Sequence, residues 1–83
     1  MIDMNKNYYI ATIVIEDWDA GYTTVNNIDT NIFDDINESR EYVKKAIIDN
    51  GGVVNDFEDS CNGYFIDNGD NYATILNWKI KKI

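Results

Sequence analysis

The sequence contains no proline and no histidine, and it has one cysteine, Cys61. Without histidine the chain lacks the usual general base near neutral pH and the commonest nitrogen ligand of metals. A single cysteine cannot form a disulfide within the chain, so the fold must be stable without the crosslinks that small secreted domains use. These absences predict a cytoplasmic protein with no catalytic residues, no cofactor and no metal site.

Catalysis would have to rest on Cys61 or on carboxylates, and neither pattern favours an enzyme. Cys61 lies in an acidic stretch, where neighbouring carboxylates disfavour the reactive thiolate. Carboxylate pairs occur throughout the chain, but 83 residues seldom enclose the deep cleft that holds two carboxylates at a fixed separation. We therefore predict that the protein is not an enzyme.

Basic residues are scarce: seven Lys and Arg face fifteen Asp and Glu, and the net charge is -8. Binding to nucleic acid requires neutralisation of phosphates, and membrane surfaces are also anionic, so direct binding to either is disfavoured. No apolar run approaches the roughly 18 residues of a transmembrane helix. The charge favours a protein partner with a basic surface, and DNA mimicry is one form of this hypothesis. The alternative is a solvated surface that only keeps the protein soluble.

The distribution of apolar residues predicts a single α+β domain over residues 1–83. Residues 8–16 and 22–26 have the composition of a β-hairpin. A helical pattern begins at Asp34, with Asp34, Asp35 and Asn37 as candidate N-caps, and ends at Asn50-Gly51-Gly52. Residues 53–57 alternate as a short strand would. We expect a small antiparallel sheet of four to five strands, in ββαβββ order, with one helix packed across one face.

The C-terminal third carries the clearest hairpin signal. Asn68-Gly69 is the preferred dipeptide of a two-residue type I′ turn, and residues 70–80 alternate between two faces. Lysines at the end of this segment are typical of an edge strand that must resist aggregation. If they do not protect it, that edge is a natural seam for a homodimer through the C-terminal strand.

The candidate partner-binding residues are acidic or aromatic side chains in predicted turns. Trp18 stands out, because an exposed tryptophan between two aspartates is a typical interface anchor. In the alternative interpretation Trp18 folds back over the hairpin and covers a thin core. The full candidate set is Asp17, Trp18, Asp19, Tyr22, Glu58, Asp59, Asp67 and Asp70.

These observations support two functional hypotheses. The first is a non-enzymatic protein-interaction module; its small size, acidity and amino-acid usage typical of AT-rich coding sequence suggest an inhibitor of a host protein, encoded by a phage or mobile element. The second is a homo-oligomeric protein that binds or sequesters a small ligand at the subunit seam, because a chain this short seldom encloses a pocket alone.

Overall fold

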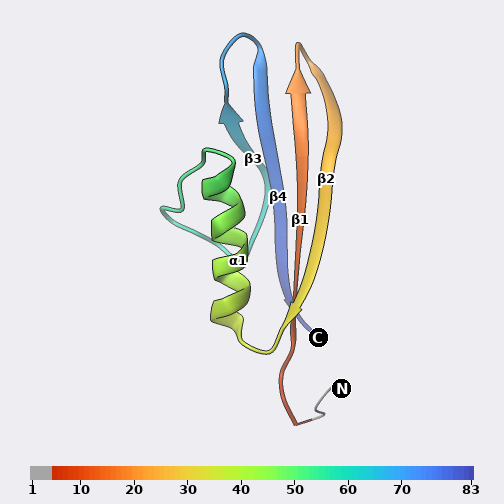
Figure 1. The fold of residues 1–83 in the computed structure, drawn as a ribbon, viewed down its shortest axis with the longest axis vertical. Coiled ribbons are helices and arrows are strands. Elements are labelled where there is room, and N and C mark those ends of the chain that lie inside the picture. Colours follow the sequence, from red (N-terminus) through yellow and green to blue (C-terminus); the bar gives the residue numbers. More distant parts are fainter. Residues whose placement is uncertain (1–4) are drawn as a thin grey trace.

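A computed structural model describes residues 5–83. The elements are β1 (Tyr9–Asp19), β2 (Tyr22–Phe33), α1 (Ile36–Asp49), β3 (Ser60–Asp67) and β4 (Tyr72–Lys82). All strand pairings are antiparallel, and the strand order is β2-β1-β4-β3 (Figure 1). The predicted α+β class, a small antiparallel sheet with one helix, is confirmed.

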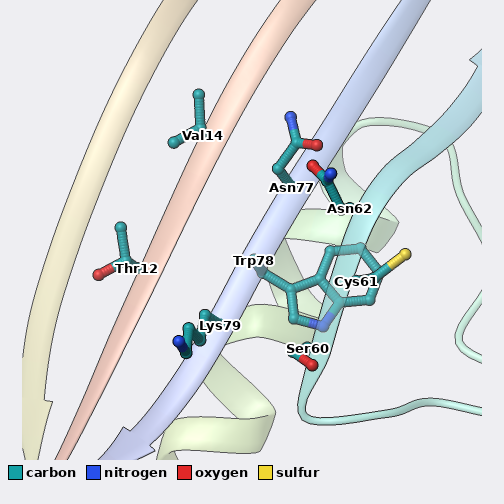
Figure 2. A pocket seen from close by; sticks show the side chains of 8 residues that line it. All are labelled: Thr12, Val14, Ser60, Cys61, Asn62, Asn77, Trp78 and Lys79. Atoms are coloured by element: carbon teal, nitrogen blue, oxygen red, sulfur yellow. The ribbon is translucent and has the colours of Figure 1, made fainter.

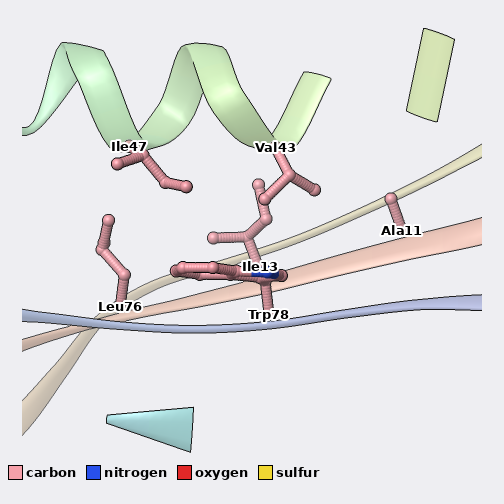
Figure 3. Close-up of a cluster of buried hydrophobic side chains, with 6 residues drawn as sticks. All are labelled: Ala11, Ile13, Val43, Ile47, Leu76 and Trp78. Atoms are coloured by element: carbon pink, nitrogen blue, oxygen red, sulfur yellow. The ribbon is translucent and has the colours of Figure 1, made fainter. Parts of the chain in front are cut away.

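The core lies between α1 and the two central strands. Val43 and Ile47 stand four residues apart on the helix, so they share one face, and both are fully buried. Figure 3 shows them pointing toward side chains that rise from the sheet. The sheet side of this cluster consists of Ala11, Ile13, Leu76 and Trp78.

Both predicted helix ends are confirmed by their hydrogen bonds. At the start, Oδ1 of Asp35 accepts a hydrogen bond from the backbone N–H of Asn37 at 2.7 Å, as an N-cap does. At the end, Gly51 has a φ of +91°, and the backbone N–H of Gly52 donates to the carbonyl of Ile47 at 2.9 Å. Gly51 therefore ends the helix in the left-handed conformation that the sequence predicts.

The sequence predicts a two-residue turn between β3 and β4, but the structure has its two-residue turn between β1 and β2. β1 and β2 are joined by Ala20 and Gly21, whose φ angles of +49° and +93° have the signs that a type I′ turn requires. The predicted two-residue turn at Asn68-Gly69 is wrong, because residues 68–71 all lie between β3 and β4. Oδ1 of Asp67 accepts from the N–H of Gly69 at 2.8 Å, so a side chain takes part in a wider turn.

Residues 53–57 form a loop instead of the predicted strand. The hydroxyl of Tyr64 binds both backbone groups of Val53, accepting from its N–H at 2.9 Å and donating to its carbonyl at 3.0 Å. The ring of Phe57 is stacked on Trp78 with centroids 5.9 Å apart. Val54 and Phe57 therefore cover the side of the core, and the element order is ββαββ.

The C-terminal strand is central, so its predicted position at a sheet edge is wrong. β4 pairs with β1 on one side and with β3 on the other, and the edges are β2 and β3. A homodimer through a free backbone edge of this strand is therefore not available. The predicted alternation of β4 is confirmed: Leu76 and Trp78 face the helix, whereas Lys79 and Lys81 belong to the opposite face.

Gly52→Ala is expected to lower the free energy of unfolding by about 1–3 kcal/mol through overpacking. A Cβ at this position would lie 2.7 Å from Cγ2 of Ile47 and 2.9 Å from Cε1 of Tyr64. Urea denaturation followed by tryptophan fluorescence measures the change. Gly21→Ala is the control, because its Cβ would meet no atom within 4 Å and only backbone strain remains. Unchanged stability of Gly52→Ala would show that this contact relaxes freely.

Candidate functional site

The sheet has a second face that neither the helix nor the 50–59 loop covers. Along β1 the side chains alternate between the two faces of the sheet. Ala11 and Ile13 lie under α1, and Thr12 between them points away from it. The strand register extends this face across all four strands. We call it the open face. Its apolar members are Ile10, Val14, Trp18, Val25, Ile28, Ile32, Phe65, Ala73 and Ile75.

Large apolar side chains on the two edge strands are the most exposed part of the open face. The exposed fractions are 63% for Ile28, 59% for Ile32 and 55% for Phe65. Contiguous exposed apolar side chains on one surface mark an interaction site, whereas scattered ones do not. The open face is therefore the first candidate for a functional surface.

Trp18 belongs to the open face, where it contacts Phe65 across the sheet. The two rings meet edge to face with centroids 6.1 Å apart, although one lies on β1 and the other on β3. Ala73 on the intervening strand is fully buried. Trp18 is thus half-buried against the sheet, but on the face away from the helix and the core.

A bulge in β3 creates a hollow on the open face. Cys61 pairs with Trp78 and Tyr64 with Leu76, which leaves two residues, Asn62 and Gly63, on the bulged strand. The hollow has a volume of about 430 Å³. Figure 2 shows the side chains that surround it. They include Thr12 and Val14 from β1, Asn77 and Lys79 from β4, and Ser60 and Asn62 from β3.

The side chain of Asn77 joins the three strands at this hollow. Its Oδ1 accepts from the backbone N–H of Gly63 at 2.7 Å, and its Nδ2 donates to Oε1 of Glu16. Both ends of the amide are therefore used within the chain. The second carboxylate oxygen of Glu16 remains available to a partner, since only Oε1 takes part in this contact.

Charges on the open face are separated along the strands. Glu16 pairs with Ile75, and Asp67 pairs with Ala73, so both acids lie in the half of the face nearer the hairpin turns. Lys79 and Lys81 lie in the half nearer the termini. The ion pairs among residues 5–83 involve none of these four side chains.

Six of the eight predicted partner-binding residues come together at the hairpin end of the sheet. This end extends beyond the helix (Figure 1), and a hydrogen bond from Ala20 N–H to the Asn71 carbonyl, 2.9 Å long, ties its two turns together. The six residues are Asp17, Trp18, Asp19, Tyr22, Asp67 and Asp70. The structure therefore groups most of the set at one acidic and aromatic end.

Asp17 accepts two side-chain hydrogen bonds at the hairpin end. It accepts hydrogen bonds from Nδ2 of Asn26 at 2.8 Å and from the hydroxyl of Tyr72 at 3.0 Å. The hydrogen bond to Asp17, together with the negative charge of that carboxylate, raises the pKa of the Tyr72 phenol above its usual value. The hydroxyl therefore stays protonated and keeps Asp17 in place on the side of the sheet that carries the helix.

Glu58 and Asp59 lie apart from the other six and hold the loop against the helix. Both oxygens of the Asp59 carboxylate accept from Arg40, at 2.8 and 3.0 Å. The backbone carbonyl of Glu58 accepts from Nε1 of Trp78 at 2.8 Å. The hydrogen bond from Arg40 lowers the pKa of Asp59. The contacts of Glu58 and Asp59 are therefore explained by the structure of the loop.

Residues that sequence reasoning missed are the exposed apolar side chains of β2. Val25, Ile28 and Ile32 are three and four residues apart, which is the spacing of a helix and conceals the strand. The cause is a bulge: Ile15 pairs with Asn27 and Glu16 with Val25, which leaves Asn26 unpaired. A strand pattern that allows one bulge would have placed all three on one face.

No family model, no curated protein and no solved structure matches this chain. Within residues 5–83, the one helix is too short and too polar to cross a membrane. The same residues contain no cluster of three or more Asp, Glu or Cys side chains placed to hold a metal ion. The function is therefore argued from the open face and the hairpin end.

Asp59→Asn is expected to destabilise the fold slightly at neutral pH and to leave partner binding unchanged. The pKa of Asp59 is depressed in the folded state, so its contribution to stability is present above the unfolded pKa of about 4. This contribution is lost as the pH falls through the lower folded pKa. Urea midpoints of the wild type and the variant should therefore differ at pH 7 and converge at acid pH, once the carboxyl group of the folded protein is protonated. A constant difference across this range would contradict the assignment.

Proposed function

We propose that this chain is a non-enzymatic protein-interaction module that binds a protein through the open face of its sheet. The observation that carries the proposal is the set of apolar side chains that the strand register places on that face, four of which are more than half exposed. Burial of one such side chain contributes roughly 1.5–3 kcal/mol. The open face therefore offers enough apolar area to support specific binding.

The acidic hairpin end supports a partner with a basic surface. It adjoins the open face, and it brings together four aspartates of the chain's fifteen carboxylates. Opposite charges on two proteins increase their rate of association and fix their relative orientation more than they increase affinity. In this proposal the hairpin end orients the partner and the apolar side chains supply most of the binding free energy.

Ile28→Ser is expected to reduce binding to a protein partner at least tenfold. Ile48→Ser is the matched control, because Ile48 is a similarly exposed isoleucine (57% against 63%) on the outer side of the helix. Tagged wild type and both variants are used to capture proteins from a lysate of cells that also express an untagged copy of the chain. Quantitative mass spectrometry then compares the captured proteins.

The comparison between the two isoleucine variants decides the proposal. A protein that is captured by the wild type and by Ile48→Ser, but is lost with Ile28→Ser, supports binding through the open face. Equal capture by all three proteins would exclude the open face as the binding surface.

Trp18→Ala is expected to weaken binding of the captured partner by at least about 2 kcal/mol, the loss typical of an interface hot spot. Trp18 packs outside the core, so the fold should remain near intact, which circular dichroism can verify. Calorimetric titration of the purified partner measures the affinity. An unchanged affinity would remove Trp18 as an anchor.

A further inference from the structure

The open face is complementary to itself in both charge and shape. We propose that its partner is a second copy of this chain, packed face to face so that the strands of the two sheets run in opposite directions. This inference rests on the proposed function and names the partner of the same surface. The basic surface that faces the acidic hairpin end is then the half of the second copy's open face that carries Lys79 and Lys81. The twofold axis lies between the two sheets, runs across the strands, and passes at the level of Val14 and Asn77, which pair with each other.

The axis brings the acids of one copy to the lysines of the other. Glu16 belongs to the row of Ile75, two residues from Asn77, and Lys79 lies two residues from Asn77 in the opposite direction. Rotation about the axis exchanges these two rows. The same rotation exchanges the row of Asp67 and Ala73 with the row of Lys81. Packed sheets lie about 10 Å apart and neighbouring strands about 4.8 Å apart, so these long side chains can meet.

The same axis places Phe65 over the hollow of the other copy. Phe65 pairs with Ile75, and Ser60, at the rim of the hollow, pairs with Lys79. These rows exchange under the rotation, and both residues lie on β3, which the axis superposes on the β3 of the second copy. An aromatic ring that is 55% exposed in one chain therefore meets a hollow of about 430 Å³ in the other.

The area of the open face suits a stable dimer. Three strands of 11 or 12 residues and one of 8 residues span at most about 36 by 19 Å, or about 600–700 Å² for each copy. Stable interfaces bury about 800 Å² on each partner. Two sheets stacked in this way form a sandwich whose second core consists of the side chains that are exposed in the single chain.

The dimer also decides between the two functional hypotheses. A ligand pocket at the subunit seam would require the hollow beside Asn62 to stay open, whereas Phe65 of the second copy occupies it here. The apolar residues of β2 would be buried at the same time, without any pairing between the edge strands. The seam is therefore a protein interface and not a ligand pocket.

The charge pairing can be tested with two single variants, Glu16→Lys and Lys79→Glu. Each variant alone places like charges opposite each other in its own dimer, so each is expected to dimerise at least tenfold more weakly than the wild type. A mixture of the two restores both Glu–Lys contacts in a heterodimer. One variant is labelled uniformly with 15N, because the two substitutions alone change the mass too little to separate the dimers. Native mass spectrometry at about 0.15 M ionic strength, where charge effects beyond about 8 Å are screened, then resolves the two homodimers and the heterodimer.

The contact between Phe65 and the hollow has its own test. Phe65→Ala is expected to raise the dissociation constant of the dimer about thirtyfold, the effect of losing a hot spot. Ile48→Ala, on the outer side of the helix, is the control and should leave the constant unchanged. Sedimentation equilibrium measures both, and circular dichroism verifies that each variant is folded.

The possible outcomes separate this inference from the proposed function. A wild-type dimer that weakens with each single charge variant and re-forms as the heterodimer supports the second copy as partner. A dimer that is insensitive to Phe65→Ala overturns the face-to-face geometry and indicates pairing through β2, the opposite edge. A wild type that stays monomeric at about 100 µM, a concentration far above a dissociation constant of about 1 µM, excludes a second copy as the partner. In that case the capture experiment with Ile28→Ser still decides whether the open face binds another protein.

Discussion

One helix of 14 residues can cover only one face of a four-stranded sheet, and this constraint determines most of the surface of the protein. The helix is about 21 Å long, whereas a strand of eleven residues is about 36 Å long. Part of the sheet therefore extends beyond the helix, and no element within residues 5–83 covers the second face. The side chains on that face nevertheless include isoleucine, valine and phenylalanine, which a solvated face does not require.

The two β-bulges give the open face its particular shape. The bulge at Asn62 and Gly63 removes side-chain volume where β3 passes Asn77, and this produces the hollow. The bulge at Asn26 keeps Val25 on the same face as Ile28. Bulges also increase the local twist of a sheet and so change how it can stack on another. The apolar side chains and the hollow consequently belong to one surface.

The sequence predicted the fold class, the helix and both of its ends, because these depend on local signals. Asp35 and Gly51 act through contacts with residues close to them in the chain, and the alternation of residues 72–80 needs no distant partner. The strand order could not be predicted in this way, since it depends on which strands pair across the chain. The lysines of β4 were therefore assigned to an edge, although they lie on the open face of a central strand.

The candidate site was predicted in part for the same reason. Residues of the predicted turns, such as Asp17 and Asp70, are recognisable one by one, and the meeting of two hairpins at one end then groups them, although Asp17 lies in β1. Asp59 carries the same local signal but binds Arg40, nineteen residues away in the sequence. The apolar residues of β2 were missed because a bulge gave them helical spacing. Long-range strand pairing and β-bulges are therefore the two features that the sequence pattern did not predict.

The most direct test of the open face as the seam between two copies of this chain is its accessibility to solvent at increasing protein concentration. Methyl NMR signals can be recorded with a soluble paramagnetic agent, which broadens the signals of exposed groups. We predict that the methyl groups of Ile28 and Ile32 become protected as the concentration rises, whereas those of Ile48 and Val53 remain broadened. Equal accessibility of all four residues at every concentration would contradict the account.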